Sequence, residues 1–175
     1  TATDDAFESL GQAVGYQFGE LHGICHCAAD FEALAPLKLD TLTDWVSLFR
    51  ANAAAPAAIN RVLEPYLLRT EHAAVILVGE SHGHAPSAYW GSFAVSKAAL
   101  EAYFKIQADE WSDAPMRINL LIPGPIHSPF RAKTHPGEDK SNLPTCESLA
   151  PVLLELMQPE PAGARGRLIE FSARA

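Results

Sequence analysis

The uninterrupted apolar run at residues 73–79 constrains the fold more than any other feature of the chain. It reads AAVILVG and contains no polar side chain. A strand that faces water on one side alternates apolar and polar residues, whereas a strand covered on both faces is apolar throughout. The run therefore predicts an interior strand of a parallel sheet, with helices packed on both faces.

Helical and extended patterns alternate along the rest of the chain. Residues 4–18 have apolar side chains at helical spacing and end at Gly19, where a helix C-cap is expected. Three further helices are predicted, over residues 43–69, 93–111 and 148–157, and Thr43 is the expected N-cap of the first of them. Further strands are predicted over residues 23–29, 116–122 and 167–171. Residues 125–144 are predicted to be a loop. Because alternating strands and helices form parallel βαβ units, we expect one α/β domain over residues 1–175, with about four strands and flanking helices.

The composition is that of a globular protein. A chain of 175 residues can bury one hydrophobic core, and its 48% hydrophobic and 19% charged residues suit that class. The net charge is −8 and no cluster of lysine and arginine occurs, which argues against nucleic-acid binding. No apolar run has membrane-spanning length, and no signal-peptide pattern opens the chain. We expect a soluble, cytoplasmic protein that binds neither nucleic acid nor membrane.

Several cysteines and glycines need an interpretation before any site is assigned. Cys25 and Cys27 stand two apart on a predicted strand, too far along it for a disulfide, and we interpret them as small buried side chains. Gly11, Gly15 and Gly19 are four apart, but no strand precedes them as a phosphate-binding turn requires. We expect Gly11 and Gly15 to pack closely against a neighbouring element.

Four segments carry motifs in a definite order. Residues 21–29 read LHGICHCAA, 49–56 read FRANAAAP, 89–100 read YWGSFAVSKAAL and 119–128 read NLLIPGPIHS. They resemble, in order, the fourth strand, the helix asparagine, the active-site helix and the Pro-Gly motif of the short-chain dehydrogenase/reductase family. The resemblance covers nearly the whole chain. It implies a Rossmann-like, doubly wound parallel sheet and NAD(P)-dependent chemistry on an alcohol or carbonyl.

The family has seven strands, whereas four are predicted here. The resemblance implies that the first three strands precede residue 1, together with the glycine-rich turn that approaches the cofactor pyrophosphate. We therefore expect a truncated, C-terminal part of the family fold. The residue that selects between NAD and NADP belongs to the same preceding part, so either cofactor is compatible with the sequence.

The resemblance also implies an active site with two of its four positions substituted. Phe93 stands where the family has its catalytic tyrosine, while the lysine is present as Lys97. Glu80 occupies the position of the substrate-orienting serine, with Ser81 one residue further on, and Asn52 matches the helix asparagine. The tyrosine moves the proton, and loss of a general acid costs ~10²–10⁴ in rate. Phe93, together with the absence of the glycine-rich turn from this sequence, therefore implies a degenerate or inactive enzyme, and we do not expect this chain by itself to bind the cofactor well.

Two further features belong to this implied site. Pro56 follows Asn52 by four residues and has no N–H to donate, so the helix is expected to kink there. The kink either frees a carbonyl for a water that leads to Lys97 or is only structural. The residues that the resemblance places against the cofactor are Lys97, Pro123, Gly124, Ile126 and Ser128.

Two alternatives depend on other side chains. Tyr89 could bring its phenol toward the site, although Lys97 is eight residues further on, ~12 Å along a helix; otherwise Tyr89 and Trp90 wall the pocket. Zinc-ligand types also follow two neighbouring strands, in no established zinc spacing. These are His26, Cys27, Glu80, His82 and His84. The alternative function is therefore a metal-binding or ligand-binding family member without enzymatic activity.

Self-association is expected at two places. The resemblance implies dimerisation through the helices at residues 43–69 and 93–111, which carry bulky apolar side chains on more than one face. These side chains are Trp45, Phe49, Tyr66, Leu100, Phe104 and Trp111. The strand at residues 23–29 is expected to have an open edge, paired with a second copy or covered by residues 1–5. The small-molecule substrate is not indicated.

Overall fold

A four-stranded parallel sheet forms the centre of the molecule. The computed structural model describes residues 2–159 and 165–171. Strands β1 (Gly23–His26), β2 (Ala74–Val78), β3 (Arg117–Ile122) and β4 (Leu168–Glu170) lie in that order, each parallel to its neighbour. The predicted α/β fold with about four strands is confirmed.

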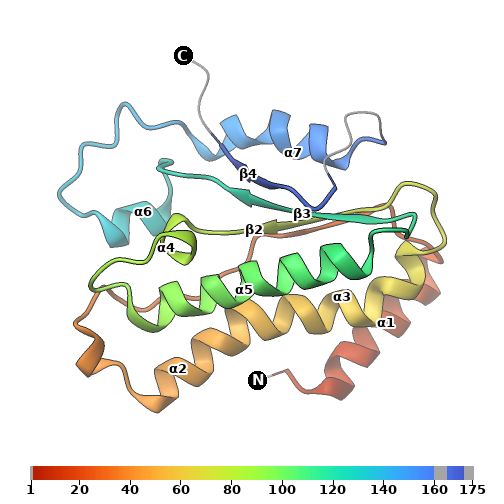
Figure 1. The fold of residues 1–175 in the computed structure, drawn as a ribbon, viewed down its shortest axis with the longest axis horizontal. Coiled ribbons are helices and arrows are strands. Elements are labelled where there is room, and N and C mark those ends of the chain that lie inside the picture. Colours follow the sequence, from red (N-terminus) through yellow and green to blue (C-terminus); the bar gives the residue numbers. More distant parts are fainter. Residues whose placement is uncertain (1, 160–164, 172–175) are drawn as a thin grey trace.

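Helices cover both faces of the sheet (Figure 1). One face carries α5 (Gly91–Glu110) and a long helix made of α2 (Leu42–Phe49), a π-helical turn (Arg50–Ala54) and α3 (Ala55–Leu67); the other carries α7 (Ala150–Met157). Val75 and Leu77 of β2 pack with the side chains of α3 and α5, whereas Ile76 packs with those of α7. Since successive strand residues point to opposite faces, this two-sided cover explains the unbroken apolar run.

The first helix, α1 (Asp4–Phe18), lies outside this layer and packs on α3. It ends at Gly19, whose φ of 76° is in the left-handed region that favours glycine. A Cβ at Gly11 would lie 2.9 Å from the Val62 carbonyl oxygen, and one at Gly15 would overlap the Tyr66 ring. The expected close approach at Gly11 and Gly15 is confirmed.

The N-cap of the long helix lies two residues earlier in the chain than expected. Thr41, not Thr43, is its N-cap, because the Thr41 hydroxyl accepts the Asp44 N–H while the Asp44 carboxylate accepts the Thr41 N–H at 2.7 Å. At the predicted kink the helix takes a π-turn, in which the Ala55 N–H donates to the Arg50 carbonyl. The wider turn precedes Pro56, which has no N–H for the regular ladder.

Other element boundaries also differ from the sequence prediction. Helix α5 begins at Gly91 rather than Phe93, because the Asp40 carboxylate accepts the Ser92 N–H at 2.7 Å. The predicted loop at residues 125–144 contains a helix, α6 (Pro129–Thr134), which the Ser128 hydroxyl caps. A short helix, α4 (Ser81–His84), follows β2, so His82 and His84 lie on a helix. A 3₁₀ turn, Cys146–Leu149, precedes α7.

The prediction for the two neighbouring cysteines is wrong. Strand β1 ends at His26, three residues before the predicted end, so Cys27 is no longer held in the extended spacing. The Cys25 and Cys27 sulfur atoms lie 3.3 Å apart as free thiols, and both residues are exposed. Their burial depended on cover for this part of the sheet, which the described residues do not supply.

Candidate functional site

The carboxyl ends of β1, β2 and β3 open onto one cavity of about 300 Å³. Ligands of open parallel sheets bind at this edge. Residues that follow the three strands line the cavity together with side chains from α5 and α6. The site residues proposed from the sequence that line it are Glu80, Ser81, Phe93, Lys97, Pro123, Gly124, Ile126 and Ser128.

Lys97 is the buried cation of the cavity. Its side chain comes from the second turn of α5, and only 4% of the residue is exposed. The Nζ donates to the Val78 carbonyl oxygen at 3.2 Å and lies 6.0 Å from the centroid of the Phe93 ring. Burial lowers the pKa of Lys97 to about 8, and the negative charge of Glu80 partly opposes that shift.

Phe93 lies in a cluster of aromatic rings. The Phe31 ring meets it edge-on at a centroid distance of 5.1 Å, and the Phe130 and Trp90 rings lie 5.4 and 6.0 Å away. The Trp90 indole also stacks on the His82 imidazole, with 3.6 Å between ring centroids. Phe93 therefore contributes to an aromatic wall of the cavity.

Glu80 lines the cavity with its carboxylate, as expected for a substituted serine position. The carboxylate accepts the His82 N–H at 2.6 Å, caps α4, and lies 3.1 Å from His82 Nδ1. Ser81 donates its hydroxyl to the same carboxylate at 3.0 Å. The Ser81 hydroxyl hydrogen is thus held by Glu80 and does not act as an independent donor toward a ligand.

Asn52 does not line the cavity. Its amide is buried in the π-turn, where Oδ1 accepts the Asp30 N–H at 2.7 Å and Nδ2 donates to the Asp30 carbonyl and to Ser96 Oγ, both at 2.9 Å. Ser96 in turn donates to the Phe93 carbonyl at 2.7 Å. The side chain of Asn52 therefore ties the loop after β1 to α5.

Helix α6 adds two cavity residues that the sequence analysis missed. Phe130 closes the aromatic wall, and the Arg131 guanidinium forms two 2.6 Å hydrogen bonds with the Glu138 carboxylate. The Ser128-Pro129 pair is a helix-start signal, a capping side chain followed by proline at the first helical position. This pair could have indicated the helix, although the many turn residues of the segment favoured a loop.

The two alternative chemistries are not assembled by the fold. Tyr89 is exposed, has a φ of 74° and borders a separate hollow, so its phenol does not line the cavity that contains Lys97. Trp90 does line the Lys97 cavity, as expected. Among the candidate ligands, His26 bonds Asn60 at 2.8 Å and His84 pairs with Glu101 at 3.1 Å. Within residues 2–159 and 165–171, no three His, Cys, Asp or Glu side chains are grouped to hold a metal ion.

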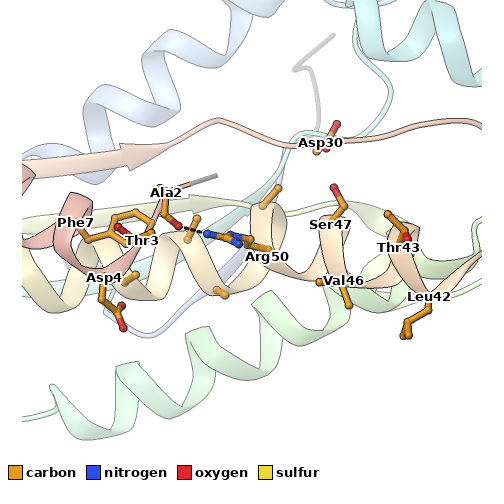
Figure 2. Close-up of a pocket in the computed structure, with 14 residues that line it drawn as sticks. Ala2, Thr3, Asp4, Phe7, Asp30, Leu42, Thr43, Val46, Ser47 and Arg50 are labelled. Carbon is orange, nitrogen blue, oxygen red and sulfur yellow. Dashed lines mark hydrogen bonds between the residues drawn. The ribbon is translucent and has the colours of Figure 1, made fainter.

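A second, larger hollow of about 960 Å³ lies along α2, the π-turn and the N-terminal residues (Figure 2). Arg50 reaches across it to donate to the Ala2 carbonyl oxygen, and Leu42 and Val46 form part of its wall. None of the substituted or retained active-site positions lines this hollow. The smaller cavity at the sheet edge is therefore the candidate functional site.

Comparison with known proteins agrees with the motifs and the sheet. The family model described as enoyl-(acyl carrier protein) reductase matches residues 1–164. The chain belongs to the short-chain dehydrogenase/reductase family. It is 28% identical over 157 residues to the uncharacterized oxidoreductase YciK of Escherichia coli K12, a match that covers 90% of this chain and 62% of YciK. The chain thus spans less than two thirds of this curated relative.

Two solved structures of short-chain dehydrogenases are also similar to the chain. One is from Salmonella enterica serovar Typhi, with 25% identity and a TM-score of 0.93 over 97% of this chain and 70% of that one. The other, a proposed short-chain dehydrogenase from Escherichia coli CFT073, was solved with NADPH; it is 26% identical, with a TM-score of 0.92 over 97% of this chain and 70% of that one. That neighbour therefore binds NADPH in its crystal structure. No described helix of the present chain is long and apolar enough to cross a bilayer.

Proposed function

We propose that this family member is an oxidoreductase-like protein whose hydride-transfer activity on small alcohols and carbonyl compounds is strongly impaired. The observation that carries the proposal is the contrast between two neighbours on α5. Lys97 is buried at the cavity as the family requires, whereas the side chain four residues before it is a phenyl ring. The binding half of the site is retained, and the proton-transfer half is substituted.

The donor set at the sheet edge fits a nicotinamide cofactor. The Val78 carbonyl is the single hydrogen-bond acceptor of the Lys97 ammonium within the described residues, so two of its three N–H groups remain for ribose hydroxyls. Pro123, Gly124, Ile126 and Ser128 would flank the ligand, since they line the same cavity after β3. When bound, NAD or NADP would accept or donate the hydride.

Two side chains oppose catalysis by the usual route. A proton has to pass to or from the substrate oxygen as hydride moves, and the phenyl ring of Phe93 has no hydroxyl that can exchange one. Glu80 adds a carboxylate where the family places a neutral hydroxyl donor, and an ionised carboxylate accepts hydrogen bonds but donates none. Both substitutions leave a carbonyl oxygen without its expected donors.

Restoring the phenol tests the proposal. In the full-length protein, Phe93→Tyr is expected to raise kcat/KM for reduction of small ketones or aldehydes by ~10²–10⁴, the contribution typical of a positioned general acid. Phe93→Leu is the matched control, because it changes the ring without adding a hydroxyl. NADH or NADPH oxidation followed by absorbance gives the rates, and fluorescence titration gives cofactor affinity separately.

The outcomes of this experiment separate three cases. An unchanged rate in Phe93→Tyr, recovered in the double variant with Glu80→Ser, would make the carboxylate the stronger block. Steady cofactor consumption by the unsubstituted protein that depends on Lys97 would contradict the proposed impairment. Ligand binding without turnover in every variant would favour the alternative, a non-enzymatic binding protein of this family.

We also propose that the protein is a homodimer through α2, α3 and α5. Leu42, Val46 and Ile106 support it, because their side chains are 79%, 58% and 60% exposed on these helices. Three of the side chains expected at this interface, Leu100, Phe104 and Trp111, instead face the core of their own chain. A cytoplasmic location remains a prediction from composition.

A further inference from the structure

The amine of Lys97 has an unusual environment for a lysine. Lys97 lines a cavity of about 300 Å³, and the residue as a whole is only 4% exposed. Its Nζ donates to the Val78 carbonyl and lies 6.0 Å from the centroid of the Phe93 ring. In relatives with a tyrosine, a phenol oxygen would share this position and favour the charged ammonium. Phe93 supplies no oxygen, so nothing at position 93 holds the proton on Nζ.

The charges around the amine are few. Glu80 and Arg131 are the charged side chains that line the cavity, and the Arg131 guanidinium is already bonded to Glu138. Cys27 lines it after β1, and His82 of α4 lies against Glu80. Among these charged groups Glu80 favours protonation of Lys97, and burial outweighs it, so that the pKa falls to about 8. At about pH 7.5 roughly a quarter of such an amine is neutral, against roughly 0.1% of an ordinary exposed lysine.

A neutral amine beside an apolar cavity is the arrangement that lysines use for covalent chemistry with carbonyl compounds. Trp90, Phe93 and Phe130 give this cavity aromatic walls, which favour an apolar, planar ligand. We propose that Lys97 is a carbonyl-reactive amine that condenses with a small aromatic or apolar aldehyde or ketone to form an imine in this cavity. The proposal uses the cavity of the proposed function and does not depend on hydride transfer from a nicotinamide.

The reaction balances without an added oxidant or reductant. The Nζ lone pair forms a bond to the carbonyl carbon, the carbonyl π pair moves to oxygen, and a proton moves from nitrogen to that oxygen to give a carbinolamine. The hydroxyl of the carbinolamine then takes up a proton, the nitrogen lone pair forms the C=N bond as the C–O bond breaks, water leaves, and the iminium nitrogen releases its remaining proton. The net change is one carbonyl and one amine to one imine and one water. The Glu80 carboxylate, in the same cavity, is the group suited to carry these protons.

Reductive trapping with benzaldehyde tests the proposal on the unsubstituted protein. Benzaldehyde and sodium cyanoborohydride are added at about pH 7.5. The cyanoborohydride reduces any imine to a stable benzylamine, and peptide mass spectrometry identifies the labelled lysines. Lys97 is expected to be labelled about tenfold faster or more than the exposed lysines, because far more of it is neutral. Lys38 and Lys133 provide the exposed internal controls.

The pH dependence and a variant complete the test. The labelling rate of Lys97 is expected to rise to a plateau with an inflection near pH 8, whereas that of Lys38 keeps rising. Lys97→Arg retains the charge and cannot form an imine, so its peptide is expected to carry no label. Label spread evenly over the lysines, or an inflection for Lys97 above about pH 10, would overturn the proposal. Neither result would affect the NADPH titration, so this failure is distinguishable from failure of the proposed function.

Discussion

Position 93 differs from the family pattern by one oxygen atom, and its effect extends to the neighbouring lysine. A phenol there would exchange a proton with substrate and stabilise the Lys97 ammonium. With Phe93, the ring contributes to a cluster with Phe31 and Phe130, and among the described residues the lysine has one hydrogen-bond partner, the Val78 carbonyl. Burial lowers the pKa of Lys97, and the Phe93 ring carries no oxygen that would oppose that shift.

The buried charge at residue 97 is expected to lower stability in a pH-dependent way. The pKa of Lys97 is about 8 in the folded protein and 10.5 ordinarily, so between these values the unfolded chain binds more protons and native stability rises with pH. Below about pH 8 both states are charged, and the charge costs up to about 3 kcal/mol. Lys97→Met should raise the free energy of unfolding by up to that amount near pH 7.

Urea unfolding near pH 7 and near pH 10.5 measures this effect. The gain in Lys97→Met is expected to shrink toward zero at the higher pH, where the native lysine is already neutral. Lys38→Met is the control, because Lys38 is exposed. If Lys97→Met raised the free energy of unfolding equally at both pH values, the difference between the variant and the unsubstituted protein would come from packing and not from charge.

At the scale of elements, the packing of α4 on α5 places Lys97. A Cβ at Gly83 would lie 2.8 Å from the Lys97 Cβ and 2.9 Å from its carbonyl carbon, too close for either backbone to stay in place. Gly83→Ala is therefore expected to cost about 1–3 kcal/mol by overpacking and to slow benzaldehyde labelling of Lys97. Gly137→Ala is the control, since a Cβ there meets nothing within 4 Å. Equal stabilities of the two variants would contradict this packing.

The start of α2 offers a second prediction at this scale. The capping box joins Thr41 to Asp44, so Thr41→Ala leaves the Asp44 N–H and the first turn without their side-chain partner. It is expected to lower the free energy of unfolding by about 1 kcal/mol. Thr43→Ala, inside the helix and exposed, should change it by less than about 0.5 kcal/mol. Chemical denaturation compares the two, and the reverse ranking would restore Thr43 as the cap.

At the scale of the whole molecule, the proposed dimer can be tested by charge placement. Val46→Glu puts a carboxylate on the exposed apolar face of α2 and is expected to convert the protein to a monomer in sedimentation velocity at micromolar concentration. Leu154→Glu is the matched control, because Leu154 is 63% exposed on α7, across the sheet. A monomer before any substitution would argue strongly against the dimer.

The outer edge of β1 is the second candidate contact between molecules. Within the described residues β1 pairs only with β2. Residues 2–5 do not cover its outer edge, because Ala2 contacts Arg50 of the long helix and Asp4 and Asp5 begin α1; Thr1 lies outside the described residues. An apolar edge of this kind invites a further strand. Hydrogen exchange of its outer amides is expected to slow as protein concentration rises. A crystal with residues 23–29 open to solvent would show that no partner strand binds there.

The features that depend on residues close together in the chain were predictable from the sequence. The run at residues 73–79 required cover on both faces, Gly11 and Gly15 required a close neighbour, and Pro56 required a break in the regular helix ladder. Each of these requirements acts within a few residues. The motif order likewise placed Phe93 and Lys97 at the site, because their spacing along one helix is a local property.

Only the tertiary structure decided which side chains surround the amine. Phe31, Phe93 and Phe130 come from three distant segments and pack together. Two of these rings, Phe93 and Phe130, line the cavity beside Lys97, whose burial lowers its pKa. Helix α6 is six residues long, too short to form without such packing, which is why composition suggested a loop. Cys25 and Cys27 were misjudged for the same reason: burial depends on what covers a face, and a strand's own sequence does not contain its cover.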